Sequence, residues 1–310
     1  MAAPSSSEFE LIARHFDRPA RGAVLGIGDD AALLRPAPGM ELAVSTDLLL
    51  EGRHFRAGAD ARRLGHKALA VNLSDLAAMG AAPRWATLAL ALPAADEAWL
   101  SAFAEGFFSL ADRFGVALVG GDTTRAREGA GLAICVTIVG EVPPGGALLR
   151  SGARAGDDVW VSGTLGGAAL ALEDAADAAA RERLDVPEPR VALGERLRGL
   201  ASAAIDVSDG FAQDLGHILE RSGVGAVVEY ARLPAFPGAA PRHVLAGGDD
   251  YELVFTAPAA RRASIEEAAR RLALPVARVG EIRSGAAPAV VLDAERRPMP
   301  LPRGFDHFGA

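Results

Sequence analysis

The stretch KALAVNLSDLAAMG, residues 67–80, predicts the helix around which we expect the fold to be organised. Leu, Ala and Met favour a helix, and Gly80 is typical of a helix end. Asn72 and Asp75 lie three residues apart and therefore on one helix face. Because Asp75 stands among apolar residues, we expect a cation or several donors from elsewhere in the fold to bind its carboxylate. A simple cap of a neighbouring loop is the alternative for this stretch alone.

Length and composition predict a globular protein with two domains. The chain has 310 residues, of which 50% are hydrophobic and 23% are charged. A formal net charge of −8 and the lack of a dense basic run argue against nucleic-acid binding. The first residues contain no signal-like segment, and no later apolar run reaches membrane length, so we expect a cytoplasmic protein without a membrane partner.

Strand-like and helix-like segments alternate along the chain, which predicts an α/β (α+β) protein. We expect strands that end at residues 45–47 and 120–124, and a single Ala-rich helix from about residue 166 to 183. The sequence PPGG at residues 143–146 is the clearest boundary signal. We therefore predict an N-terminal domain at 1–145 and a C-terminal domain at 146–310.

Six aspartates share one kind of setting, beside Gly, Ser or Thr at strand ends or on an apolar helix: Asp30, Asp47, Asp75, Asp122, Asp206 and Asp209. Each alone could be a turn former or a cap. Two such charges about 4 Å apart would repel by about 4 kcal/mol at an effective dielectric near 20, so a cluster of them requires divalent cations. Ser45 and Thr46 add hydroxyl oxygens beside Asp47, and oxygen ligands suit Mg²⁺.

Two glycine-containing segments are candidates for binding phosphate. Gly120 and Gly121 let main-chain amides approach a phosphate closely, and the segment DVSDG, residues 206–210, lies where a helix N-terminus would favour an anion. Arg150 could bind a nucleotide phosphate, with a solvated arginine as the equal alternative. Neither a GxxxxGK[ST] loop nor protein-kinase motifs occur. Metal-assisted phosphoryl transfer therefore fits best.

Six segments, taken together and in order, make the chain resemble the thiamine-monophosphate kinase family over nearly its whole length. They are GIGDDAA (26–32), STD (45–47), the stretch 67–80, GGDTT (120–124), DVSDG (206–210) and GGDDYEL (247–253). The resemblance implies the fold shared with aminoimidazole ribonucleotide synthetase and selenophosphate synthetase, in which the N-terminal sheets pair across a homodimer. It also implies ATP-dependent, Mg²⁺-assisted phosphorylation of thiamine monophosphate to thiamine diphosphate, the last step of thiamine diphosphate biosynthesis.

The resemblance further implies a role for particular residues. The implied ligands of several Mg²⁺ ions are Asp30, Ser45, Thr46, Asp47, Asp75, Asp122, Asp206 and Asp209. Among them, catalysis through Mg²⁺ is implied for Asp47, Asp75, Asp122 and Asp209. The implied ATP contacts are Gly121, Asp122, Arg150 and Ser208, and the implied thiamine monophosphate contacts are His54, Glu252 and Phe305.

The chain departs from the family pattern at one nucleotide contact, since a tyrosine of the family has no counterpart among Phe103, Glu105, Phe107 and Phe108. Lys67, the only lysine, is a hypothetical support for a phosphate or an acidic ligand. Selenophosphate synthetase is disfavoured because no Cys lies in an N-terminal Gly-rich loop, and aminoimidazole ribonucleotide synthetase matches less well. A metal-dependent phosphatase would use the same carboxylates on water, and a non-catalytic Mg-nucleotide binder would merely hold ATP.

Overall fold

The computed structural model describes residues 7–174, 176–302 and 304, so the predicted contact Phe305 lies outside the described residues. The chain divides into two compact units. Unit 1 comprises Met1–Leu73 and Ala82–Pro143, and unit 2 comprises Ser74–Ala81 and Pro144–Ala310. Helix α2, Ala61–Ala78, contains the predicted helix and contributes residues to both units.

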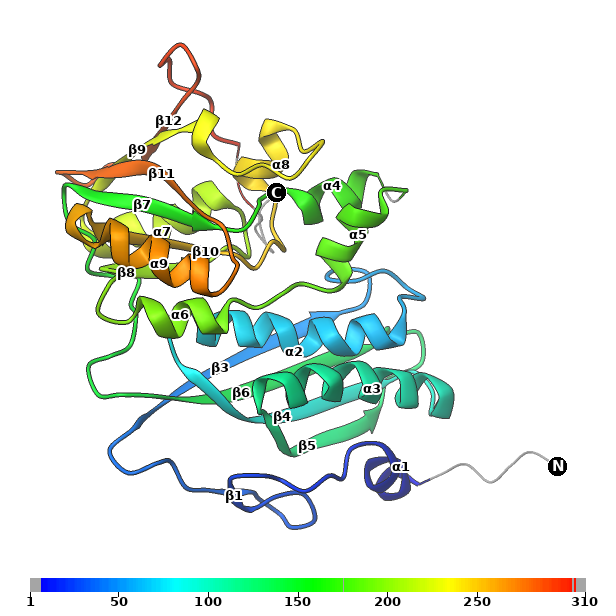
Figure 1. The fold of residues 1–310 in the computed structure, drawn as a ribbon. Coiled ribbons are helices and arrows are strands. Elements are labelled where there is room, and N and C mark those ends of the chain that lie inside the picture. Colours follow the sequence, from blue (N-terminus) through cyan, green and yellow to red (C-terminus); the bar gives the residue numbers. More distant parts are fainter. Residues whose placement is uncertain (1–6, 175, 303, 305–310) are drawn as a thin grey trace. The chain divides into compact units, whose positions relative to one another are not determined.

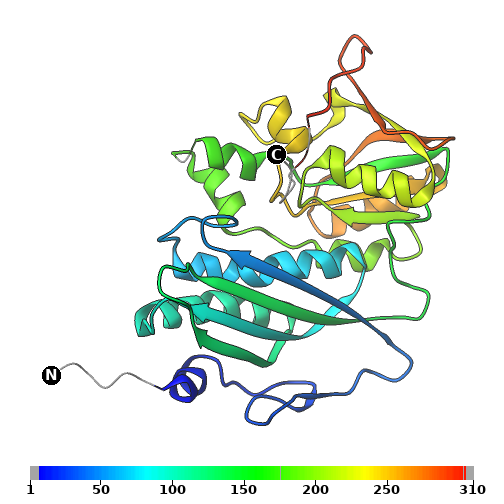
Figure 2. The same cartoon turned by 180° about the vertical axis from the view of Figure 1, so that it is seen from behind.

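Unit 1 is built on a four-stranded sheet with strand order β3-β6-β4-β5. Its strands are β3 (Glu41–Leu50), β6 (Ala133–Val142), β4 (Ala82–Leu92) and β5 (Ala117–Arg125). Only β4 and β5 run parallel. Helices α2 and α3 (Glu97–Phe114) lie together against one face of this sheet (Figure 1), and Figure 2 shows the sheet from its other face. The smaller elements of unit 1 are α1 (Glu8–His15), β1 (Ala23–Leu25) and β2 (Leu33–Leu34).

Two polar segments of unit 1 lie inside strands and not at strand ends, so this part of the prediction is wrong. Residues 45–47 are in the middle of β3, which pairs with β6 without interruption from Glu41↔Val142 to Leu50↔Ala133. Residues 120–124 belong to β5 and pair with β4. Both strands are sheet edges, where side chains meet fewer neighbours, so polar residues are tolerated there. The apolar pattern therefore ends before the strand does.

Unit 2 contains a six-stranded sheet with order β12-β9-β11-β7-β10-β8, in which only β12 and β9 are parallel. The strands are β7 (Asp157–Ser162), β8 (Ala203–Asp206), β9 (Gly225–Glu229), β10 (Leu253–Pro258), β11 (Val276–Arg283) and β12 (Ala289–Leu292). The helices are α4 (Gly167–Glu173), α5 (Ala178–Asp185), α6 (Val191–Leu197), α7 (Phe211–Ser222), α8 (Pro241–Ala246) and α9 (Arg262–Arg271), with short 3₁₀ turns η1 (Tyr230–Arg232) and η2 (Ala259–Arg261).

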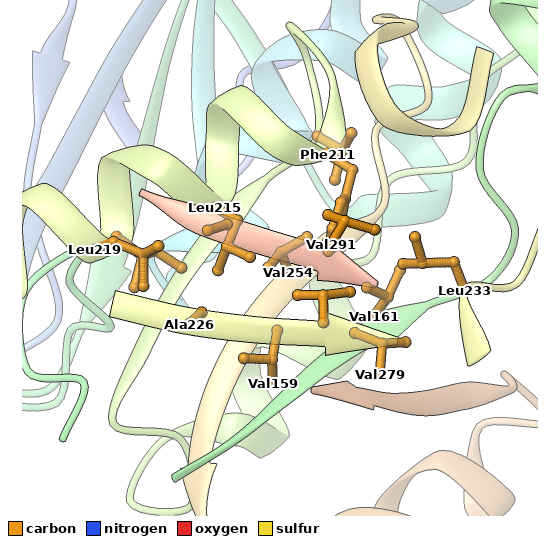
Figure 3. Packing of buried hydrophobic residues seen from close by; sticks show 14 of the residues in the cluster. Val159, Val161, Phe211, Leu215, Leu219, Ala226, Leu233, Val254, Val279 and Val291 are labelled. Carbon is orange, nitrogen blue, oxygen red and sulfur yellow. The ribbon is translucent and has the colours of Figure 1, made fainter. Parts of the chain in front are cut away.

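Helix α7 directly follows the predicted DVSDG loop and fixes the end of this loop against the sheet. Its residues Phe211, Leu215 and Leu219 are almost completely buried and pack on sheet residues such as Val161 and Val291 (Figure 3). Their spacing of four residues is that of a helix with one apolar face. None of the helices in the described part of the chain combines the length and apolar character needed to cross a bilayer.

The single helix predicted from residue 166 to 183 is instead two helices, α4 and α5. Between them, the carboxylate of Asp174 accepts the amide hydrogen of Ala176 at 3.0 Å. Asp177 caps α5 by accepting the amide hydrogen of Ala180 at 2.9 Å. These local side-chain acceptors compete with the helical pattern and end it, although the alanine content favours a helix.

Candidate functional site

Asp75 is the one polar group that the central stretch of α2 leaves accessible. All residues from Lys67 to Ala78 are buried except Asp75, which is partly exposed. The predicted helix is therefore confirmed. The expected apolar surroundings are present along the helix, while Asp75 itself is partly exposed. Lys67, in contrast, is only 4% exposed.

Ser74, the neighbour of Asp75 in unit 2, binds a second predicted metal ligand. Its hydroxyl donates a hydrogen bond of 2.7 Å to Oδ2 of Asp206, and both residues are buried. A hydroxyl donor stabilises the ionised form of a buried carboxylate and fixes its orientation. This role of Ser74 is not among the predictions made from the sequence. A serine inside an apolar helix, directly before an aspartate, was the available signal.

We expect Ser74→Ala to lower the free energy of unfolding of unit 2 by about 1–3 kcal/mol, because a buried carboxylate loses a charged-group hydrogen bond. The rate of the phosphoryl transfer predicted from the sequence should fall about tenfold as Asp206 loses its orientation. Urea unfolding and steady-state kinetics measure the two effects. Ser101→Ala, at an exposed serine of α3, is the control and should leave both unchanged. An unaltered Ser74→Ala variant would show that the hydroxyl has no such role.

The two main-chain amides directly before α7 are bound by a side chain of the helix. Oδ2 of Asp214 accepts the amide hydrogens of Asp209 at 3.1 Å and of Gly210 at 3.0 Å. These two amides precede Phe211, the first residue of α7, so the expectation that the amides of the helix N-terminus itself favour a phosphate stays a prediction. Burial, together with the charge of Asp209, raises the pKa of Asp214 to about 7. Ser208 and Asp209 themselves are partly exposed.

In unit 1, Asp47 is held by α2. Its amide donates a hydrogen bond of 3.2 Å to Oδ1 of Asn72, which is fully buried. Asp47 lies opposite Val136 of β6, a residue buried on the helix-covered face. Thr46 lies on the other face, where its hydroxyl hydrogen-bonds that of Thr137 at 2.8 Å. The hydroxyl of Thr46 and the carboxylate of Asp47 thus point to opposite faces of the sheet.

Gly121 and Asp122 lie at the opposite edge of the sheet from Asp47. The paired positions run across the four strands from Asp47 through Val136 and Leu88 to Gly121. At about 4.8 Å per strand, the two edges are roughly 14 Å apart. A Cβ at Gly121 would lie 1.8 Å from the carbonyl oxygen of Leu88, so the close strand contact requires glycine. Within one chain, the structure does not bring Asp47 and Asp122 together.

Three further predicted residues lie in loops or near the surface. Asp30 is exposed in a turn in which its amide donates to Oδ1 of Asp29 at 3.3 Å. Nδ1 of His54 accepts the amide hydrogen of Leu50 at 3.0 Å, which orients the imidazole. Arg150 has an exposed side chain in unit 2. Within the described parts of the chain, no three His, Cys, Asp or Glu side chains lie close enough to hold a metal ion by themselves.

Glu252, a predicted substrate contact, lies completely buried in an ion-pair cluster. Its carboxylate accepts hydrogen bonds from Arg190 at 2.6 and 2.7 Å, from Arg183 at 2.6 Å and from Ser162 at 2.6 Å. Burial raises the pKa of Glu252, but these hydrogen bonds and the two arginine charges outweigh it and lower the pKa overall. The ion pairs therefore contribute stability at neutral pH and lose it as the pH falls. A direct contact with thiamine monophosphate stays a prediction.

We expect Glu252→Gln to lower the free energy of unfolding by about 3 kcal/mol, because Arg183 and Arg190 would lose the carboxylate with which both of them pair. Denaturant unfolding at pH 7 measures this loss. Glu267→Gln is the matched control, since Glu267 pairs with two arginines at the surface and should matter little. Equal stability of the Glu252→Gln variant and the wild type would contradict a structural role.

Helix α3 contains the four positions at which the tyrosine of the family has no counterpart, and only one of them is exposed to solvent. Phe103, Phe107 and Phe108 are buried in the core of unit 1. Glu105 is exposed and forms an ion pair with Arg62. An adenosine contact from this part of α3 would therefore have to come from Glu105, which is not aromatic.

Comparisons with known proteins agree in fold and in family. Residues 28–142 match the AIR synthase related protein N-terminal domain, and residues 154–293 match the AIR synthase related protein C-terminal domain. The thiamine-monophosphate kinase of Escherichia coli K12 is 44% identical, over 97% of this chain and 98% of its own. The crystal structure of thiamine-monophosphate kinase from Stenotrophomonas maltophilia K279a is 47% identical, with a TM-score of 0.82 and coverage of 91% of this chain and 94% of its own.

A third relative is known with ligands. The structure described as AaThiL complexed with AMPPCP and TMP is 30% identical, with a TM-score of 0.76, and the match covers 88% of this chain and 89% of that one. The predicted fold class and resemblance are both confirmed. Through both of its domains and over almost its whole length, the chain belongs to the AIR synthase related proteins, within the thiamine-monophosphate kinase family.

Proposed function

We propose that this chain transfers the γ-phosphoryl group of ATP directly to thiamine monophosphate, giving thiamine diphosphate and ADP, in the cytoplasm. One observation carries the assignment to metal-assisted chemistry: in unit 2, the accessible Asp75 directly follows Ser74, whose hydroxyl orients Asp206. The relatives that match over almost the whole chain are thiamine-monophosphate kinases, and one of them binds AMPPCP and TMP.

The available donors fit magnesium. Asp75, Asp206 and Asp209 in unit 2, and Asp30, Ser45, Thr46, Asp47 and Asp122 in unit 1, offer carboxylate and hydroxyl oxygens, which Mg²⁺ prefers over nitrogen and sulfur. Two of these residues are held by neighbours without any ligand: Ser74 binds the carboxylate of Asp206, and Asn72 binds the main-chain amide of Asp47. When bound, Mg²⁺ neutralises charge on the phosphates and reduces the repulsion between the two anionic substrates.

The reaction does not require a general base from the protein. The acceptor is a phosphate monoester with a second pKa of about 6, so it is largely ionised at neutral pH. The residues of the chain therefore bind and orient the two substrates. We assign Gly121, Asp122, Arg150 and Ser208 to ATP, and His54, Glu252 and Phe305 to thiamine monophosphate. Asp47, Asp75, Asp122 and Asp209 act through Mg²⁺.

We further propose a homodimer in which the sheet of unit 1 pairs with that of a second copy along the edge strand β3. An apolar stripe on β3 supports it: Leu42, Val44, Leu48 and Leu50 are 44%, 62%, 52% and 39% exposed. An exposed apolar stripe of this length is typical of a protein interface. A dimer would also supply the carboxylate that one chain lacks, because Asp122 of a second copy could approach Asp47 although the two edges of one sheet are far apart.

An assay of acceptor dependence tests the proposed function. The protein is incubated with ATP and Mg²⁺, together with thiamine monophosphate or with unphosphorylated thiamine. We expect ADP release only with the monophosphate, in equal amount to thiamine diphosphate. Phosphate release without an acceptor would instead identify a phosphatase, and nucleotide binding without turnover a non-catalytic Mg-nucleotide binder.

A further inference from the structure

Asp214 is a buried carboxylate to which the assigned functions give no role. It lies on the first turn of α7 and is 1% exposed. One of its oxygens, Oδ2, accepts two amide hydrogens, those of Asp209 and Gly210. A buried side chain that binds two successive main-chain amides fixes the local path of the chain. Asp214 therefore acts on the loop of residues 206–210 and not on a ligand.

The same loop is held on its other side by residues 247–252. The carbonyl oxygen of Ser208 accepts the amide hydrogen of Asp249 at 2.9 Å, and that of Val207 accepts the amide hydrogen of Tyr251 at 2.9 Å. Gly210 has a φ of +120°, and a Cβ there would lie 2.8 Å from main-chain atoms of Ala246. The main chain of the loop is thus bound from two sides, while the side chains of Ser208 and Asp209 stay partly exposed.

We propose that Asp214 is a positioning residue, which sets the main chain of residues 206–210 so that Ser208 and Asp209 can bind the nucleotide and its metal. This inference rests on the proposed function, because Ser208 and Asp209 receive their roles from it. Since Asp214 binds the amides of Asp209 and Gly210, these amides are not available to a phosphate. A phosphate would approach the loop through a cation bound to the carboxylates and through the Ser208 side chain.

Two substitutions separate hydrogen bonding from charge. Asp214→Asn removes the charge but keeps an oxygen that can accept both amides, whereas Asp214→Leu has a similar size and offers no acceptor. Glu220→Leu, at an exposed position near the end of the same helix, is the control for an added leucine. Asp214→Ala replaces Asp214→Leu if the leucine variant does not fold.

The first measurement uses no ligand. Hydrogen–deuterium exchange followed by mass spectrometry reports the protection of the amides in residues 206–212. We expect exchange there to be about tenfold faster in Asp214→Leu than in the wild type, because two amides lose their acceptor. Exchange in Asp214→Asn and Glu220→Leu should stay within about twofold of the wild type.

The second measurement is the Mg²⁺ concentration that gives half-maximal turnover. We expect Asp214→Leu to need about tenfold more Mg²⁺, as is usual when a residue that supports a metal ligand is lost, and Asp214→Asn to resemble the wild type. The KM for thiamine monophosphate should change little. Wild-type exchange and Mg²⁺ dependence in a folded Asp214→Leu variant would overturn the proposal, and so would an Asp214→Asn variant as impaired as the leucine variant. Failure of the proposed function would appear separately, as a wild type without acceptor-dependent ADP release.

Discussion

Asp75→Asn is expected to lower turnover by about two to three orders of magnitude while KM for thiamine monophosphate changes far less, an effect comparable to losing a strong electrostatic stabiliser. Asp75 is the only residue between Lys67 and Ala78 that is not buried, and Ser74 beside it orients Asp206. Asparagine has nearly the same shape but lacks the charge that a magnesium ligand provides. The helix should therefore keep its packing while metal binding weakens.

Steady-state kinetics over a range of Mg²⁺ concentrations measure this effect. The rate should recover only in part at high Mg²⁺, because one ligand is absent at any concentration. Asp112→Asn, at an exposed aspartate of α3, is the control and should behave as the wild type. A rate within about threefold of the wild type at saturating Mg²⁺ would exclude Asp75 from the metal site.

The sequence predicted the helix around residue 75 and the aspartates well, because both depend on local composition. Leu and Ala at helical spacing produce the buried helix α2, and the motif around Asp206 ends a strand as expected. The ends of β3 and β5 were not predictable in this way. Their polar residues stay in the sheet because strand pairing continues past the apolar run, and pairing depends on distant strands.

The residues that bind and orient the predicted ligands could not be predicted from the sequence. Ser74 and Asp206 are 132 positions apart, and only the fold makes the hydroxyl of one a donor to the other. The surroundings of Glu252 were equally unpredictable from the sequence. Its motif predicts a substrate contact, whereas its environment is a buried cluster with two arginines that come from elsewhere in the chain. Burial and long-range partners are tertiary properties, and residue type alone does not report them.

A second large effect is expected from the separation of Asp47 and Asp122 at the two edges of the sheet in unit 1. Two aspartates that bind one Mg²⁺ must both place an oxygen about 2.1 Å from it. In a single chain, the buried side chains of Val136 and Leu88 fill the space between the two edges. If both carboxylates serve one active site, they come from different copies of the chain. Asp47→Asn and Asp122→Asn should then each lower turnover by about 100-fold or more.

Mixing the two inactive variants should restore activity. In a random mixture, half of the dimers contain one chain of each kind, and each mixed dimer has one site with both aspartates intact, so about a quarter of the wild-type activity should return. Mixed dimers isolated by two different tags should reach about half. A mixture of two differently tagged Asp47→Asn chains is the control and should stay inactive. Isolated mixed dimers no more active than their parents would show that each site takes both aspartates from one chain, and a monomeric wild type that phosphorylates thiamine monophosphate would contradict the shared site altogether.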